Sequence, residues 1–324
     1  MKTKAKIKTK IFLSLLFCMA LYFIFSWYPR VDLSNTAPKN FETLARQANK
    51  NEKFLNILKP FLDPAFFNAK VMDTSELKLD VVMNLVEKDL ETAVYSIKSI
   101  RDLLMHPIGK IFIVGPNKPK LQAFAEAQGA VFVNEADVLE DFQKIKPYGG
   151  WMIQQFLKLS MDRIVEQKHY LVVDADTVFL RPVLFEYGGK YLINIHWDCS
   201  IPRKKLSQEL LGHSKLWLLD FVSHHMLFSK TVLKNMRNHM ESLHKKPWID
   251  LVLEQAKSEK LQYFSEYDLY MQYLTEFSKQ PYKLVSNANL TVHRNSLPGI
   301  DAIMRAYSNN HKSLSMHHFI LRKK

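Results

Sequence analysis

The sequence predicts an α/β protein in which helices flank a parallel β-sheet, followed by a half that is richer in helix. Short apolar runs alternate with stretches of helical length in the middle of the chain, which is typical of a parallel sheet with crossover helices. The stretch from residue 76 to residue 324 has the length of one domain. A lysine-rich tail, an apolar run and a polar segment precede it, so we expect four regions along the chain.

Three β-α units open the predicted domain. Each unit begins with an apolar run that predicts a strand, and Gly or Pro residues punctuate the connections. Because crossovers between parallel strands are right-handed, consecutive units of this kind imply one parallel sheet. The strands are expected at Leu79–Val86, Lys110–Val114 and Ala130–Val133, and the helices at Leu90–Met105, Pro119–Gln128 and Trp151–Glu166.

The fourth strand ends in two carboxylates one residue apart. Tyr170–Val173 is apolar and predicts a buried parallel strand, and Asp174 and Asp176 follow it. Ligands of open α/β sheets bind outside the carboxyl ends of the strands. Two acids at that edge form a hard-oxygen site for Mg²⁺ or Mn²⁺, which can in turn hold a diphosphate. The alternative for any Asp-x-Asp is a strand end followed by an Asp-capped turn.

Helices prevail after the acidic pair. One more long strand is expected directly after it, and two short strands are expected near the C-terminus. The strands are Lys190–Ile195, Tyr282–Val285 and Leu290–His293, and the helices are Lys230–Leu243, Trp248–Ala256 and Glu266–Phe277.

Residues 11–28 form an apolar run that predicts a membrane anchor. The run has 18 residues without a charge, and a helix of that length spans ~27 Å at ~1.5 Å per residue, enough for a bilayer core. Trp27 and Tyr28 stand at its far end, where interfacial aromatic residues belong. The alternative is a cleaved signal peptide, but no small-x-small cleavage site follows before Pro29.

The tail before the anchor predicts the orientation in the membrane. Residues 1–10 contain five lysines, which favours a cytoplasmic N-terminus and a single-pass, type II arrangement. Residues 29–75 are then a stem, and residues 76–324 lie across the membrane. In a eukaryote that side is the secretory lumen, and in a bacterium the periplasm, with the anchor in the inner membrane.

Charge and cysteine content narrow the function classes. The net charge is +13, and without the five tail lysines it is 13 − 5 = +8, which suits anionic ligands. The sequence has no cysteines and histidines at zinc-finger spacing, no RNA-binding sheet motif and no segment in which basic and aromatic residues alternate. No nucleic-acid partner is therefore expected. Cys18 lies in the anchor and Cys199 is alone in the domain, which excludes a disulfide within the domain. Asn289-Leu290-Thr291 is the single glycosylation sequon.

Several short blocks, in their order and spacing, carry a family resemblance. They are Gly150-Trp151, Gln154–Leu159, Asp174–Thr177, Phe179–Pro182, His224–Phe228 and Ser265–Tyr270. With these blocks the chain resembles the DUF6492 group of glycosyltransferase-like proteins, from about Leu79 to Tyr273. The resemblance implies a GT-A-like fold, with a nucleotide-binding half followed by a more helical acceptor half.

The acidic pair and the resemblance together predict a metal-dependent glycosyltransferase. It would move a sugar from a nucleotide-sugar donor, a UDP- or GDP-sugar, to a glycan or another hydroxyl acceptor. Sugar nucleotides are supplied in a Golgi-type lumen and not normally in the periplasm, so a Golgi or other secretory-pathway membrane fits a eukaryotic protein. The resemblance specifies neither the sugar nor the acceptor.

The metal site is expected to use the acidic pair and a late histidine. Asp176 would bind Mn²⁺ or Mg²⁺ directly, and Asp174 would bind the ion or the donor ribose. His317, His318 and His293 are candidates for a third ligand, and the apolar flanks of the first two favour His317. Each of these histidines can also be an ordinary surface or strand-edge residue.

The donor is expected to meet two further segments. Lys88 and Asp89 follow the first strand, where Lys88 can pair with phosphate and Asp89 can accept from a ribose hydroxyl. Asp89 can equally cap the next helix. Gln155 and Lys158 lie three residues apart and share a helix face, from which Lys158 could reach a phosphate. A solvated helix face is the alternative for that pair.

The acceptor is expected near the start of a late helix. Ser265–Asp268 resembles a capping box, and acids there also suit the helix dipole. Functionally, Glu266 or Asp268 would be the catalytic base that takes the proton of a sugar hydroxyl, with Glu266 preferred because Asp268 is better placed to cap. His224 and His225 either line the acceptor pocket or stand at the edge of the core.

Two other function classes compete with glycosyl transfer. A haloacid-dehalogenase-type phosphatase uses a hydrophobic strand followed by Asp-x-Asp, which Asp174-Ala175-Asp176-Thr177 satisfies. That motif usually opens its domain, whereas three β-α units precede it here, and no later Asp-Asp pair follows. The other class is a non-catalytic, membrane-tethered glycan-binding protein that keeps the fold, which only an assay distinguishes from an enzyme.

Overall fold

The computed structural model describes residues 74–195, 200–212, 220–257 and 261–317. The predicted tail, the predicted anchor and nearly all of the predicted stem lie outside these ranges, as do His318 and both cysteines. In the described part of the chain, no helix has the length and apolar character needed to cross a membrane.

A five-stranded sheet in the order β3-β2-β1-β4-β8 forms the centre of the molecule. The strands β1 to β4 are parallel to their neighbours, and β8 pairs antiparallel with β4. Every residue of β1 is buried, as expected for the middle of a sheet covered on both faces. The α/β class and the parallel sheet are therefore confirmed. The strands are β1 (Leu79–Asn84), β2 (Ile108–Gly115), β3 (Val131–Asn134), β4 (His169–Val173) and β8 (His225–Ser229).

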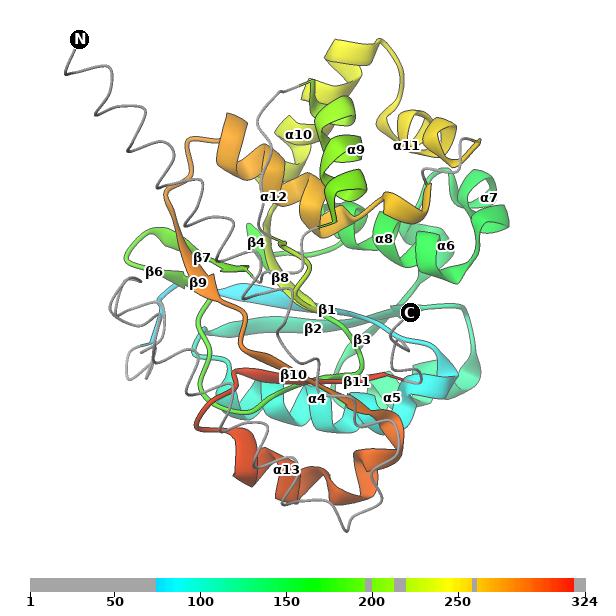
Figure 1. Cartoon of the computed structure of the whole chain (residues 1–324). Helices are drawn as coiled ribbons and strands as arrows, with labels where there is room; N and C mark the ends of the chain where they lie inside the picture. The colour runs from blue at the N-terminus through cyan, green and yellow to red at the C-terminus, as the bar shows by residue number, and fades with distance from the viewer. Residues whose placement is uncertain (1–73, 196–199, 213–219, 258–260, 318–324) are drawn as a thin grey trace, which may run out of the picture.

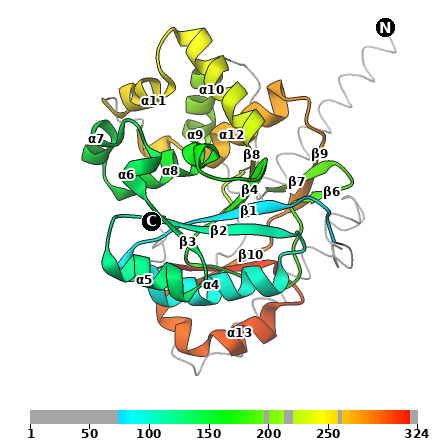
Figure 2. The ribbon, with the colours of Figure 1, turned by 180° about the vertical axis from the view of Figure 1, so that it is seen from behind.

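Helices cover both faces of this sheet (Figure 1). In both views α4 and α5 lie on one side, whereas α8, α9, α10 and α12 lie on the other (Figure 2). The second group comes mostly from the C-terminal half, which is the more helical half that the sequence predicts. The bounds are α4 (Leu90–Leu103), α5 (Pro119–Ala127), α8 (Gly150–Ser160), α9 (Ile201–Leu211), α10 (Lys230–His244), α11 (Trp248–Lys257) and α12 (Glu266–Phe277), with short helices α6 (Glu135–Val138) and α7 (Phe142–Ile145) before α8.

Two three-stranded sheets complete the described fold, in the orders β10-β11-β5 and β6-β7-β9. The first packs with helix α13 around an apolar cluster of its own, which includes Val178, Leu290 and Leu314. In β10 the sequon residue Asn289 donates to Ser315 Oγ and accepts from Ser313 Oγ, each at 2.8 Å, so its amide is already engaged in the sheet. The bounds are β5 (Thr177–Phe179), β6 (Glu186–Tyr187), β7 (Lys190–Ile195), β9 (Tyr282–Ser286), β10 (Asn289–His293), β11 (Ser313–His317) and α13 (Ile300–Tyr307).

A buried carboxylate, Asp80, ties the amino ends of three segments together. Its Oδ1 accepts from the backbone N–H of Lys110 at 2.8 Å, and its Oδ2 accepts from those of Glu166 and Gln167 at 2.7 and 2.9 Å. A Cβ at Gly109 would lie 2.3 Å from Asp80 Oδ1, so only glycine fits there. Helix α8 ends at Ser160 and not at the predicted Glu166, because the chain tightens into a 3-10 turn at Met161–Arg163.

The remaining differences from prediction involve short or mixed segments. The helix predicted to reach Met105 ends at Leu103, because the chain there turns extended and bonds to Val183 on both sides. The strands β5, β8 and β11 were not predicted. They have three to five residues, too few to show a clear alternation of apolar and polar residues. Helix α9 was not predicted. The charged residue Lys204 lies on its buried face and interrupts the apolar pattern in the sequence.

Candidate active site

The acidic pair lies on a tight turn that three backbone hydrogen bonds hold in place. Asp174 N donates to the carbonyl of His224, Thr177 N donates to the carbonyl of Asp174, and Met316 N donates to the carbonyl of Asp176, each at 2.9 Å. The turn thus joins the carboxyl end of β4 to the start of β8 and the end of β11. The predicted location of the pair, at the carboxyl edge of the sheet, is confirmed.

Three side chains surround the carboxylate of Asp174. Lys158 Nζ lies 2.7 Å from Oδ1, His224 Nδ1 lies 3.3 Å from Oδ2, and the Tyr267 hydroxyl donates to Oδ1 at 3.4 Å. Burial opposes ionisation, but the charges of Lys158 and His224 outweigh it and hold the pKa of Asp174 below its usual range. Asp174 is therefore a fixed anion that the protein itself neutralises.

Lys158 bridges Asp174 to Glu266. Its ammonium lies 2.8 Å from Glu266 Oε1 and 4.5 Å from the centre of the Tyr267 ring, and only 7 % of its side chain is exposed. Burial opposes the charge, but the two carboxylates outweigh burial and hold the pKa of Lys158 well above its ordinary value. The three side chains form a buried anion–cation–anion row, which binds α8, the acidic turn and α12 together.

Asp176 points to a different neighbour from Asp174. Its Oδ2 lies 3.6 Å from His317 Nδ1, and the His317 ring lies 5.1 Å from the ring of His224. Burial, and then the negative charge of Asp174, raise the pKa of Asp176 to about 6. Burial, and then the nearby His224, lower the pKa of His317 to about 4. The imidazole of His317 is thus neutral at physiological pH, as a metal ligand must be.

His224 contacts Asp174 from an unusual backbone conformation. Its φ of 59° lies in the left-handed region, which non-glycine residues seldom adopt. Burial disfavours a charged ring, but the hydrogen bond to Asp174 outweighs it and raises the pKa of His224. A strained residue that contacts the acidic turn is the kind of feature that clusters at functional sites.

The loop after β1 reaches the same edge of the sheet. Asp89 Oδ1 lies 2.5 Å from Arg294 Nη2, and Arg294 Nη1 donates to the Lys88 carbonyl at 2.9 Å. The side chain of Lys88 is exposed, whereas the side chain of Asp89 is largely covered by this contact. The charges of Asp89 and Arg294 both act on Asp176, so this loop and the acidic turn share one electrostatic environment.

The other predicted residues lie as follows. Gln155 accepts from the backbone N–H of Glu266 at 3.1 Å, so its carbonyl caps α12. Asp268 is fully buried and pairs with Lys204, away from Asp174. His293 accepts from the backbone N–H of Asn295 at 3.1 Å and caps the next turn. The structure therefore brings Lys158, Glu266, Asp176 and His317 to the acidic turn. It pairs Asp268 with Lys204, and it sets His293 beside His317 in the register of β10 and β11.

Three neighbours of the site have contacts that the sequence does not predict. Tyr267 stands between two acids, and its hydroxyl contacts Asp174 while its ring contacts Lys158. Arg294 carries no local signal, because it is far from Asp89 in sequence. The sequence predicts His224 in an acceptor pocket or at the core edge, and in the structure its ring contacts Asp174.

The residues at the turn fit a divalent cation with two protein ligands. No group of three His, Cys, Asp or Glu side chains able to hold a metal occurs in the ranges that the structure describes. Asp176 and His317 offer an oxygen and a neutral ring nitrogen, 3.6 Å apart. Mg²⁺ commonly uses one or two protein ligands and takes the rest from phosphates and water. Asp174, which faces Lys158, is not needed as a third ligand.

Comparisons with known proteins identify one family. The model of DUF6492, a family of unknown function, matches residues 96–317. The match confirms the resemblance from residue 96 onward, does not reach back to Leu79, and extends past Tyr273 to the end of β11. No curated protein matches the chain.

Several solved structures are similar in fold at low sequence identity. Mouse xyloside xylosyltransferase 1 is 15 % identical over 74 % of this chain and 97 % of its own, with a TM-score of 0.42. The galactosyltransferase LgtC, in complex with donor and acceptor sugar analogues, is 14 % identical over 74 % and 87 %, with a TM-score of 0.41. Glucosyl-3-phosphoglycerate synthase from Mycobacterium tuberculosis is 14 % identical over 69 % and 72 %, with a TM-score of 0.38.

Proposed function

The chain belongs to the DUF6492 family, whose function is unknown, and we propose that it is a metal-dependent glycosyltransferase acting on a nucleotide-sugar donor and a hydroxyl acceptor. The observation that carries the proposal is that the two acids of the pair have different neighbours. Asp174 is neutralised inside the protein by Lys158, whereas Asp176 faces His317 at the carboxyl edge of the sheet. Open α/β sheets bind their nucleotide ligands at that edge.

Asp176 and His317 would hold Mn²⁺ or Mg²⁺. When bound, the ion supplies Lewis-acid stabilisation to the diphosphate that departs with the nucleotide. Asp174 serves the same reaction indirectly, because its contacts with Lys158 and His224 fix the turn that aims Asp176. This role differs from direct metal binding by Asp174. Its Oδ2, which already contacts His224, would be the oxygen that accepts from a ribose hydroxyl.

The loop after β1 would bind the nucleotide. Lys88 is exposed and carries a cation that can pair with a phosphate. Asp89 is held by Arg294, so its carboxylate is oriented before a ligand arrives. We propose that Asp89 contacts the ribose, and that Lys88 supplies positive charge to the diphosphate.

Glu266 is the proposed residue at the acceptor, and Lys158 positions it. The contact with Lys158 holds Oε1 2.8 Å from the ammonium and places Glu266 beside the acidic turn. We assign Asp268 to the scaffold because it is buried against Lys204. Glu266→Gln should abolish transfer while it preserves metal-dependent nucleotide binding. Loss of nucleotide binding in that variant would reassign Glu266 without affecting the reaction class.

A panel of sugar nucleotides tests the proposal directly. The full chain would be incubated with each UDP- and GDP-sugar, with and without Mn²⁺, and the released nucleotide diphosphate measured. We expect release with at least one donor that depends on the metal. Turnover of an aryl phosphate with Mg²⁺, together with trapping of beryllium fluoride on Asp174, would instead identify a phosphatase. Binding without turnover would identify a glycan-binding protein.

We also propose that residues 11–28 anchor the protein in a membrane, with the domain on the non-cytosolic side. The support is the uncharged run of 18 residues after five lysines. A donor supplied in a Golgi-type lumen is consistent with that orientation in a eukaryote.

A further inference from the structure

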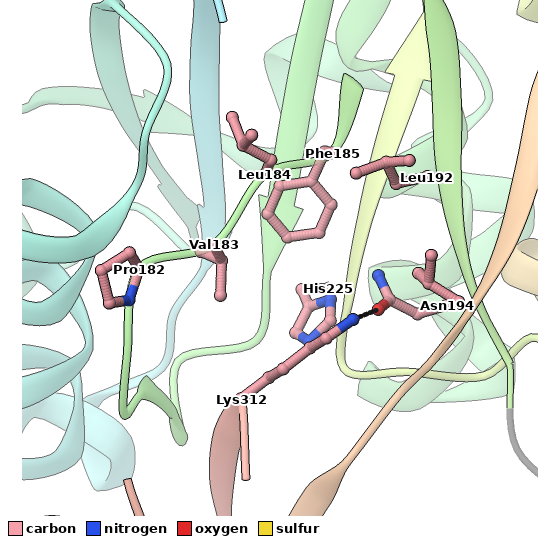
Figure 3. A pocket seen from close by; sticks show the side chains of 9 residues that line it. Pro182, Val183, Leu184, Phe185, Leu192, Asn194, His225 and Lys312 are labelled. Carbon is pink, nitrogen blue, oxygen red and sulfur yellow. Dashed lines mark hydrogen bonds between the residues drawn. The ribbon is translucent and has the colours of Figure 1, made fainter. Parts of the chain in front are cut away.

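Two pockets lie apart from the acidic turn, and both are too small for a sugar. The first, whose lining includes Phe185, His225 and Lys312, has a volume of about 20 Å³ (Figure 3). The second shares Phe185 and His225 with the first and has a volume of about 10 Å³. A cavity of this size holds about one water molecule. Both pockets are therefore excluded as sugar sites.

Trp151 is the most exposed large apolar side chain among the residues that the structure describes, at 53 %. Tryptophan is highly buried on average, and aromatic side chains are enriched where proteins bind their partners. A single exposed apolar residue is nevertheless ordinary on a protein surface. The position of Trp151 relative to the site therefore decides whether it has a role.

The face of α8 that carries Trp151 is directed at Glu266. Trp151, Gln155 and Lys158 are spaced by four and three residues, so they share one helix face. Gln155 Oε1 accepts from the backbone N–H of Glu266 at 3.1 Å, and Lys158 Nζ lies 2.8 Å from Glu266 Oε1. Trp151 follows on the same face, one turn beyond Gln155 and roughly 6 Å further along the helix axis.

The start of α8, with Trp151, lies at the carboxyl edge of the sheet. Asn84, the last residue of β1, donates from Nδ2 to the carbonyl of Gln154 at 3.1 Å. Later in the helix, the carbonyl of Lys158 accepts from the hydroxyl of Tyr170 in β4 at 2.6 Å. The helix thus runs from the carboxyl edge back along the sheet. Trp151 lies at the edge outside which ligands of open α/β sheets bind.

A glycine beside Trp151 has no structural reason to be a glycine. Gly149 has a φ of 88°, which favours glycine, but Gly150 begins α8 without a positive φ. A Cβ at Gly150 would meet no atom of the described residues within 4 Å. Glycine costs stability in a helix relative to alanine, and it is used where a ligand approaches the backbone closely. The open surface at Gly150 is therefore consistent with a ligand beside Trp151.

We propose that Trp151 determines acceptor specificity by stacking its indole ring on a pyranose ring of the acceptor. The apolar C–H face of the sugar lies on the indole, its edge lies over Gly150, and one hydroxyl reaches Glu266. A flat aromatic ring suits this contact because it offers a large apolar area at little conformational cost. The inference rests on the proposed transfer reaction, and it narrows the acceptor from any hydroxyl compound to a glycan.

Fluorine NMR of the full chain labelled with 5-fluorotryptophan tests the contact. The chain has five tryptophans, and the signal that Trp151→Phe removes belongs to Trp151. The titrants are the methyl glycosides of glucose, galactose, mannose, xylose and N-acetylglucosamine, each alone and with UDP and Mn²⁺, in a detergent without a sugar headgroup. At least one glycoside should shift the Trp151 signal, whereas the open-chain polyol sorbitol should not.

Two results of this titration would overturn the proposal. The first is a Trp151 signal that no glycoside shifts under either condition. The second is a signal that UDP or GDP shifts and no glycoside does, because the indole would then stack on the nucleotide base.

Variants at the two positions separate binding from a structural role. Gly150→Val should abolish the sugar-induced shift without lowering the melting temperature, because its side chain occupies open space. Gly299→Val is the matched control and should keep the shift, since Gly299 also has open space and no positive φ but lies at the start of α13. Trp151→Leu should raise the KM for the acceptor about tenfold and leave metal-dependent UDP binding unchanged. A lowered melting temperature in Trp151→Leu with an unchanged KM would refute the role.

The fluorine titration distinguishes this inference from the transfer reaction, because it contains no donor sugar and needs no turnover. A glycoside that shifts the Trp151 signal, in a chain that releases nucleotide from no donor, would refute the transfer reaction and keep the stacking site. Nucleotide release with no glycoside effect on Trp151 would keep the reaction and refute the stacking site.

Discussion

Replacing Lys158 by methionine tests the buried row of charges at the acidic turn. The substitution keeps the length of the side chain and removes the ammonium that lies 2.7 Å from Asp174 and 2.8 Å from Glu266. Two carboxylates then face each other without a cation. Removing one partner of a buried ion pair typically costs about 3–5 kcal/mol. Because 26 % of the Asp174 side chain is exposed, we expect a loss of about 3 kcal/mol in the free energy of unfolding.

The loss should depend on pH in a defined direction. The folded-state pKa of Asp174 lies below its ordinary value of 3.8, so the pairing stabilises the protein above that pH and is lost as the pH falls through the folded-state pKa. In Lys158→Met the two carboxylates repel each other at neutral pH and stop repelling once protonated. The difference between variant and wild type should therefore be full near pH 7 and shrink as the pH drops below about 4.

Urea unfolding followed by circular dichroism at several pH values measures this difference. The surface variant Lys98→Met is the matched control and should unfold as the wild type does, since its side chain is 73 % exposed. Adding Glu266→Gln to Lys158→Met should restore part of the stability, because it removes one of the repelling charges. A Lys158→Met protein as stable as the wild type at pH 7, or a loss that grows with acidity, would refute the reasoning.

Two further predictions concern the scaffold and the topology. Gly109→Ala should lower the free energy of unfolding by about 1–3 kcal/mol, because its Cβ would lie 2.3 Å from Asp80 Oδ1; urea unfolding at an unchanged midpoint would contradict the role of Asp80. Protease treatment of sealed microsomes should leave residues 76–324 intact until detergent is added, because the lysine tail predicts a cytosolic N-terminus; digestion without detergent would overturn the orientation.

The sequence was sufficient for the elements whose ends are clearly marked. The strands Leu79–Val86 and Lys190–Ile195 and the helix Glu266–Phe277 are present within two residues of their predicted bounds, because a charged, glycine or capping residue stands at an end of each apolar run. Strand β8 was not predicted, although it lies beside β4 in the sheet. Its five residues bury both faces, so the alternation that identifies a strand is absent.

The sequence predicts only those features of the site that depend on neighbouring residues along the chain. Asp174 and Asp176 follow a strand, and this alone places them at the sheet edge. The contact of Lys158 with both Asp174 and Glu266 depends on how α8 and α12 pack, which no spacing along the chain encodes. For the same reason the burial of Lys158 between two acids could not be predicted from its place on a helix face.

The central claim is that Asp176 binds a divalent cation that holds a nucleotide diphosphate. The most direct test is the melting temperature of the full chain with UDP or GDP, in the presence and absence of Mn²⁺. The claim predicts that nucleotide raises the melting temperature only with the metal, that Asp176→Asn removes the rise, and that Asp102→Asn, at an acid with a 52 % exposed side chain, keeps it. Metal-dependent stabilisation of Asp176→Asn equal to that of the wild type, or none in the wild type itself, would contradict the claim.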